Sequence, residues 1–110
     1  MSTNMSKLCE IAQLKQDWDG YGAPPIPQNV IERMAIILCY VARQPEIFPT
    51  ACESIQFEYG KENDEYLEFT LSEEGLHVFV MDVLGNEHSH DMPFDLQKIN
   101  EEIDCFYSVE

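Results

Sequence analysis

Two histidines near the end of the chain have a spacing that could bind a metal ion. His88 and His90 stand two positions apart, and alternate residues of a strand point to the same face. Two imidazole nitrogens on one face could hold a divalent ion, and Asp82 and Glu87 lie close by in the sequence. Histidine pairs on an acidic strand are more commonly solvated, so we expect no metal and no other cofactor. His88 and His90 are the candidate ligands if an ion does bind.

Other residue types that could do chemistry lack the surroundings that chemistry needs. His77 lies within the apolar stretch 76–83, which favours a half-buried strand histidine over a catalytic base. Neither a serine nor a cysteine has the sequence context of an activated nucleophile. Gly20-Tyr21-Gly22 lacks the preceding strand and the following lysine of a phosphate-binding loop. We therefore expect a protein that is not an enzyme.

The four cysteines are irregularly spaced and include no C-x-x-C pair: Cys9, Cys39, Cys52 and Cys105. This pattern favours buried or partly buried free thiols in a reducing compartment, with a Cys–His zinc site and disulfides as the alternatives. The segment 1–7 is polar, and no apolar run approaches the length that spans a bilayer. The expectation is a cytoplasmic protein without a membrane segment.

The charge of the chain is strongly polarised. Residues 1–44 contain four acidic and four basic residues, so the whole net charge of −15 comes from residues 45–110. The entire chain has six basic residues, too few for a basic surface that contacts successive phosphates of a nucleic acid. This number disfavours nucleic-acid binding. An acidic surface instead attracts basic protein partners.

The acidic half contains a run that predicts a partner-binding surface. A net charge of this size exceeds the magnitude of roughly 2–8 that suffices for the solubility of a small domain. The alternative is that the run is simply a solvated face. The residues expected to bind the partner are Glu58, Glu62, Asp64, Glu65, Glu68, Glu73 and Glu74.

The elements that position these residues follow from the periodicity of apolar side chains. Helical spacing predicts helices over 5–17 and 28–43, joined by a Gly- and Pro-rich connector at 19–27. The second helix should be largely buried, because further apolar residues widen its stripe: Ile36, Cys39, Tyr40 and Ala42. Pro45 stops this helix, and residues 46–53 are expected to be a loop.

From residue 55 onward, apolar residues recur at every second position instead of at helical spacing. This pattern predicts strands over 55–59, 67–71 and 76–83 and a more polar fourth strand over 87–92. Asp95 is a good N-cap for a final helix that docks on the sheet. The prediction is a single α+β domain over residues 1–110, with two N-terminal helices, an antiparallel meander of three to four strands and a C-terminal helix.

Alternation along the strands predicts which side chains face the helices. The inward set is Ile55, Phe57, Leu67, Phe69 and Leu71, and the outward set is Gln56, Glu58, Tyr66, Glu68 and Thr70. Glu58 and Glu68 are therefore expected to be cross-strand neighbours. Like charges in this position destabilise a sheet, and a basic partner or a cation could relieve the cost.

The most specific string in the chain is Trp18-Asp19-Gly20-Tyr21-Gly22-Ala23-Pro24-Pro25. It resembles a motif, W-D-G-Y-G-A-x-P, of small uncharacterised bacterial and phage proteins. There it lies between two helices and precedes an I-x-L-E-W segment, which Ile55-Gln56-Phe57-Glu58-Tyr59 resembles. The resemblance covers about residues 10–60, implies a helix–helix–sheet architecture and implies no activity.

The same string has two interpretations. Trp18 and Tyr21 could be large anchors of a buried corner between the helices, with Asp19 accepting backbone N–H groups. Alternatively, Trp18 and Tyr21 could form a pocket or a partner anchor, since aromatic side chains on loops are common binding hot spots.

Together these features predict an interaction module. Its acidic face would bind and inhibit a basic, nucleic-acid-binding protein, in the manner of an immunity protein, an antitoxin or a phage-encoded inhibitor. One alternative is a small-ligand or metal-binding domain that uses Trp18, Tyr21, His88 and His90. The other is a structural protein that forms a homodimer through the open sheet face or the fourth strand.

Overall fold

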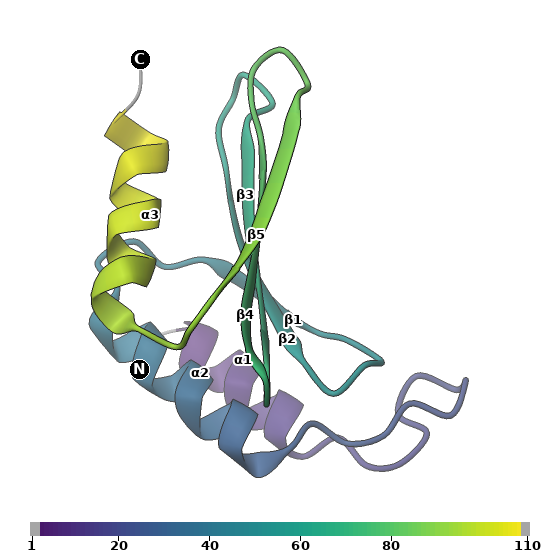
Figure 1. Cartoon of the computed structure of the whole chain (residues 1–110). Coiled ribbons are helices and arrows are strands. Elements are labelled where there is room, and N and C mark those ends of the chain that lie inside the picture. Colours follow the sequence, from purple (N-terminus) through teal and green to yellow (C-terminus); the bar gives the residue numbers. More distant parts are fainter. Residues whose placement is uncertain (1–2, 109–110) are drawn as a thin grey trace.

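The computed structural model describes residues 3–108, which fold into three helices on one face of a five-stranded sheet (Figure 1). The helices are α1 (Thr3–Ala12), α2 (Gln28–Tyr40) and α3 (Leu96–Ser108). The strands are β1 (Glu46–Pro49), β2 (Ile55–Gly60), β3 (Tyr66–Ser72), β4 (Gly75–Met81) and β5 (Glu87–Met92). The order of elements confirms the α+β class and the expected placement of the helices on either side of the strands in the sequence.

The sheet is a continuous antiparallel meander with the strand order β1-β2-β3-β4-β5. The fourth predicted strand is confirmed as β5. The prediction that 46–53 is a loop was wrong, because β1 lies within it and adds a fifth strand. Pro49 is compatible with β1 because this strand lies at the edge of the sheet, where a residue without an N–H group is tolerated.

The helices begin and end near the predicted residues, with two differences. α1 ends at Ala12 rather than at 17, and α2 ends at Tyr40 rather than at 43. At the end of α2, the Gln44 side-chain amide donates hydrogen bonds to the carbonyl groups of Leu38 (3.0 Å) and Val41 (3.2 Å). These bonds satisfy backbone acceptors that the end of a helix leaves open. Asp95 caps α3 as expected, since its Oδ1 accepts the Lys98 N–H at 3.1 Å.

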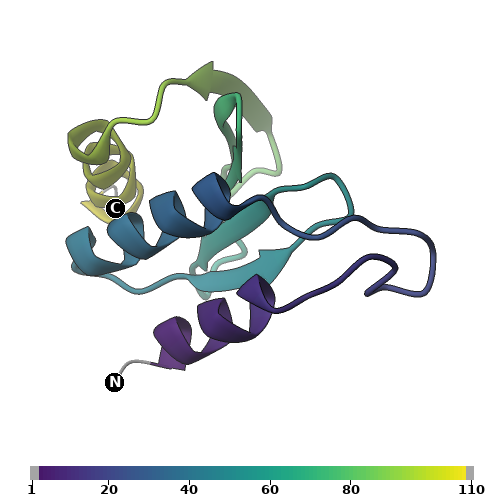
Figure 2. The same ribbon diagram turned by 90° about the horizontal axis from the view of Figure 1, so that it is seen from below.

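All of the predicted inward side chains are buried between the sheet and the helices. Phe57 and Phe69 stack at the centre with ring centroids 4.6 Å apart. They belong to a core that also includes Met34 of α2 and Ile99 and Ile103 of α3. α2 lies between α1 and α3 (Figure 2). No helix within residues 3–108 covers the other face of the sheet, which is called the open face below.

The prediction that α2 is largely buried was wrong. Ile36 and Tyr40 are 49% and 48% exposed, and Cys39 and Ala42 are exposed as well. The apolar stripe that runs from Val30 to Val41 packs into the core. The sheet covers only that side of the helix, so the opposite side stays exposed. The four cysteines are free, as expected, but all of them are exposed rather than buried.

Candidate interaction surface

Three glutamates form a row across the open face. Glu46 of β1 lies opposite Glu58 of β2, which lies opposite Glu68 of β3. Neighbouring strands are about 4.8 Å apart, so the three carboxylates are close together. The pairing of Glu58 with Glu68 follows the sequence-based expectation. Glu46 was missed because the segment that contains it was interpreted as a loop, and its alternation with the buried Ile47 is too short to be a signal by itself.

Tyr66 of β3 joins two members of this row. Its hydroxyl group lies within hydrogen-bonding distance of Glu58 Oε2 and, at 2.6 Å, of Glu68 Oε1. A phenol has one hydrogen, so it can donate to only one of these carboxylates at a time. Partial burial first, and then the two carboxylates, raise the pKa of Tyr66 above its usual value, so the phenol stays neutral.

Aromatic side chains flank the row of glutamates. Phe79 of β4 lies opposite Glu68, and its ring makes an edge-on contact with Tyr66 at a centroid distance of 6.2 Å. Phe48 of β1 lies at the edge of the sheet and is already engaged by α1, since the Lys7 ammonium lies 5.2 Å from its ring centroid. A guanidinium group can pair with a carboxylate and stack on an aromatic ring at the same time. The open face therefore suits arginine side chains.

The remaining predicted partner-binding residues do not all join this row. Glu62 and Asp64 are exposed on the turn between β2 and β3. Glu73 and Glu74 lie on the turn between β3 and β4. Successive turns of a meander lie at opposite ends of the sheet, so the two pairs are separated by the length of β3. The structure does not bring the seven acidic residues onto one surface.

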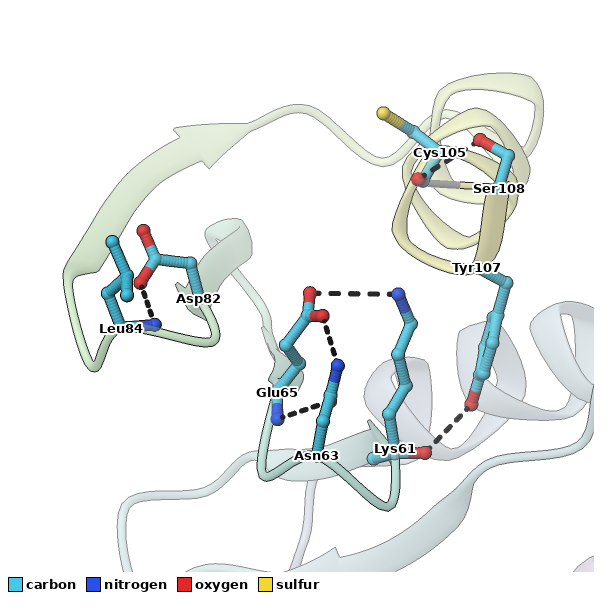
Figure 3. Close-up of polar contacts among 9 residues, drawn as sticks. Lys61, Asn63, Glu65, Asp82, Leu84, Cys105, Tyr107 and Ser108 are labelled. Carbon is cyan, nitrogen blue, oxygen red and sulfur yellow. Dashed lines mark hydrogen bonds and ion pairs between the residues drawn. The ribbon is translucent and has the colours of Figure 1, made fainter. Parts of the chain in front are cut away.

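Glu65 faces away from the open face altogether. It accepts a hydrogen bond from Asn63 Nδ2 at 2.7 Å and lies 3.6 Å from the Lys61 ammonium (Figure 3). Glu65 also lines a small cavity with Leu67 and Phe106, on the helix side of the sheet. Glu65 directly precedes Tyr66, whose side chain lies on the open face. Because side chains alternate along a strand, the Glu65 side chain points to the helix side of the sheet. We therefore exclude Glu65 from the candidate surface.

The candidate metal ligands have separate partners. His88 Nε2 lies 4.0 Å from Asp82 Oδ2, whereas His90 Nε2 lies 3.2 Å from Glu102 Oε1 of α3. Within residues 3–108, no group of three or more His, Cys, Asp or Glu side chains is arranged to hold a metal ion. The histidine pair is thus engaged in two different contacts rather than in one site.

His77 is exposed on the open face rather than half-buried, because its position alternates with the buried Leu76 and Val78. Its cross-strand neighbour is Asp91 of β5, and the two side chains meet with 2.8 Å between Nδ1 and Oδ1. This contact ties β4 to the edge strand and engages the imidazole in a structural pair.

The loop between α1 and α2 projects from the body of the protein (Figures 1 and 2). Trp18 is half-buried, and its Nε1 donates a hydrogen bond to the Pro24 carbonyl group at 2.8 Å. Tyr21, in contrast, is 93% exposed. The buried-corner interpretation therefore fits Trp18 and does not fit Tyr21, for which the pocket or partner-anchor alternative stays a prediction.

Two aspartates hold this loop in shape. Asp19 Oδ1 accepts the N–H groups of Tyr21 (2.9 Å) and Ala23 (3.0 Å), and Asp17 Oδ1 accepts the N–H of Gly22 (2.6 Å). The N–H groups of Tyr21 and Ala23 lower the pKa of Asp19 below its usual value. Gly20 and Gly22 adopt φ angles of 79° and 88°, a region that favours glycine. The loop is consequently ordered although its tip buries little.

The residues of the ligand-binding alternative are not close together. Trp18 lines a groove with Ile47 and Pro49 of β1, whereas His88 and His90 belong to β5. These strands are the opposite edges of the sheet. A site that uses both sets of residues is therefore not formed.

Comparison of the chain with models of protein families, with curated proteins and with solved structures gave no match. Among residues 3–108, no helix is both long enough and apolar enough to cross a membrane.

Proposed function

We propose that this chain is a small, non-enzymatic interaction protein that binds and inhibits a basic protein partner through its open face. The observation that carries the proposal is the row Glu46–Glu58–Glu68, which gathers three carboxylates at adjacent cross-strand positions without a helix above them. Tyr66 and Phe79 complete the surface with aromatic rings. Tyrosine, and arginine on the partner side, are enriched among the residues that dominate binding energies.

The electrostatics of this surface favour a cationic partner. Like charges at directly opposite strand positions destabilise the sheet, and bound guanidinium or ammonium groups would remove that cost. The net charge of −15 also accelerates association with a basic protein. Carboxylates at this spacing can occupy the place of phosphates, so a nucleic-acid-binding protein blocked at its basic site is the partner we favour.

Tyr21 supports a second point of attachment to the same partner. An exposed tyrosine on a loop that is already ordered loses little conformational entropy when it binds. The Oδ1 atoms of Asp17 and Asp19 accept backbone N–H groups of the loop, which holds the exposed ring of Tyr21 in place. This interpretation makes Tyr21 a partner anchor and not the wall of a ligand pocket.

The experiment that tests the proposal compares two variants of equal charge. Glu58→Gln/Glu68→Gln removes two carboxylates from the open face, and Glu101→Gln/Asp104→Asn removes two from exposed positions of α3. Binding of an oligoarginine peptide is measured by calorimetry at ~0.05 M and ~0.5 M salt, between which screening increases strongly. We expect tighter binding at low salt and a loss of at least about fivefold for the open-face variant alone. Equal losses in both variants, or binding that does not depend on salt, would overturn the proposal.

A further inference from the structure

The outer side of α2 carries an apolar stripe that the fold leaves uncovered. Ile36 and Tyr40 are each about half exposed, at 49% and 48%. Together with Ala35, Cys39 and Leu96 of α3, they line an open groove whose surface is almost entirely apolar. The spacing of Ile36, Cys39 and Tyr40 at i, i+3 and i+4 places them on one side of the helix.

α2 therefore has two apolar sides. One consists of the core residues, among them Val30, Met34 and Ile37, which are completely buried by the sheet. The other faces outward, away from the sheet. Residues 34–40 of α2 are apolar on nearly all sides, and a helix with this pattern is normally buried on all sides. The second side of α2 consequently fits a surface that another protein covers.

We propose that a second copy of this chain covers it, through antiparallel packing of α2 against α2 around a two-fold axis. Such an axis, level with the centre of the stripe, places Ala35 of one copy opposite Tyr40 of the other and Ile36 opposite Cys39. Each large side chain then meets a smaller one, which suits close packing of helices. An isologous contact of this kind is the commonest form of homodimer.

The charge distribution favours a second copy at this position. Residues 28–43 contain Glu32, Arg33 and Arg43, so this segment is slightly positive in a chain whose net charge is −15. Both arginines are held beside α2, because Arg33 lies over the ring of Phe94 and Arg43 over the ring of Tyr107. Two copies that meet here bring together the parts with the least mutual repulsion.

The dimer leaves the open faces accessible. α2 lies on the helix side of the sheet, so the open face points away from the proposed interface (Figure 2). If the proposed function holds, the dimer presents two acidic faces and gains avidity toward a partner with repeated basic sites. The dimer itself does not depend on that function, and it is tested without any partner.

The test is the molar mass of the purified chain, measured by sedimentation equilibrium in a reducing buffer at ~0.05 M and ~1 M salt. Reducing conditions exclude disulfide-linked dimers, since all four cysteines are exposed. We expect a reversible dimer whose dissociation constant falls as salt screens the repulsion between copies. Ile36→Glu should weaken it by at least about tenfold, because the new charge would be buried in the contact. Ile36 is half exposed, so this variant should keep its thermal stability.

Leu84→Glu is the matched control. Leu84 is a similar aliphatic residue, is 82% exposed on the turn between β4 and β5, and acquires the same charge when substituted. This variant should dimerise as the wild type does. A wild-type chain that stays monomeric at both salt concentrations would overturn the proposal. A dimer that Ile36→Glu leaves intact would also overturn it, and would indicate the open face or the β5 edge as the interface instead.

Discussion

The carboxylates of Glu58 and Glu68 lie directly opposite each other on neighbouring strands, and both are within hydrogen-bonding distance of the hydroxyl group of Tyr66. A sheet does not normally gather like charges in this way, because each carboxylate raises the energy of the other. Tyr66 reduces the cost without removing it, since one hydroxyl hydrogen serves two acceptors. The arrangement is thus an unneutralised acidic pair held in place by a hydrogen bond.

Replacing Tyr66 by phenylalanine should lower the stability of the fold. The variant loses a hydrogen bond to a charged acceptor, and such bonds contribute about 1–2 kcal/mol when partly exposed. The free energy of unfolding in urea measures this loss. Tyr21→Phe is the control, because Tyr21 is 93% exposed and its hydroxyl should contribute nothing to stability. Equal unfolding free energies for Tyr66→Phe and the wild type would contradict the role of the hydroxyl group.

The protein should become less stable as the pH rises above 10. Burial raises the pKa of Tyr59 and Tyr66 in the folded chain above the ordinary value of 10.0. The folded state then holds these protons more tightly than the unfolded state, so their stabilising effect is present below pH 10 and is lost at higher pH. Urea unfolding measured between neutral and alkaline pH should show this slope. Tyr66→Phe should make the unfolding free energy less dependent on pH in this range. An unchanged pH dependence in that variant would show that Tyr66 is not its cause.

Trp18 and Tyr21 should differ in their contribution to stability. Trp18→Ala removes a half-buried ring and its hydrogen bond to Pro24, which should cost about 1–3 kcal/mol and lower the melting temperature by several degrees. Tyr21→Ala should change the unfolding free energy by less than about 0.5 kcal/mol, because the side chain is almost fully exposed. Thermal unfolding of the two variants distinguishes a structural role, expected for Trp18, from a partner-binding role, expected for Tyr21. A large loss for Tyr21→Ala would show that the tyrosine is structural after all.

Asp95→Ala should destabilise α3 by about 1 kcal/mol, because it removes the side-chain oxygen that accepts the Lys98 N–H. Hydrogen exchange of the amide groups in α3 reports this loss locally, and we expect faster exchange in its first turn. Asp95→Ser retains a capping oxygen and should restore most of the protection. Uniform acceleration throughout the sheet would instead indicate that the substitution affects the whole fold.

The parts of the fold that were predictable from sequence share one property, a long periodic pattern. Alternation over β2 and β3 predicted their inward and outward faces and the opposition of Glu58 to Glu68. β1 could not be predicted, because only the four residues Glu46–Pro49 carry its pattern and one of them is a proline. Glu46 was missed with it, so the row of glutamates was predicted with two of its three members.

The remaining errors came from the assumption that apolar or acidic residues near each other in sequence also share an environment in the fold. Ile36 and Tyr40 looked like core residues, but the sheet covers only one side of α2. Glu65 and Glu73 belong to the same acidic run as Glu68, yet one faces the helices and the other lies beyond the far end of β3. The side that a residue faces depends on strand register and on layer order, which local composition does not specify.

The most direct test of the central claim is a map of amide chemical shifts during titration of the isotopically labelled chain with an oligoarginine peptide. Binding at the open face predicts the largest changes at Glu46, Glu58, Glu68 and Phe79, with small changes along α3. The changes should collapse when salt is added, since screening weakens exposed charge pairs. Changes spread evenly over all acidic residues, or largest at α3 or at Glu73 and Glu74, would contradict the assignment of the open face as the binding surface.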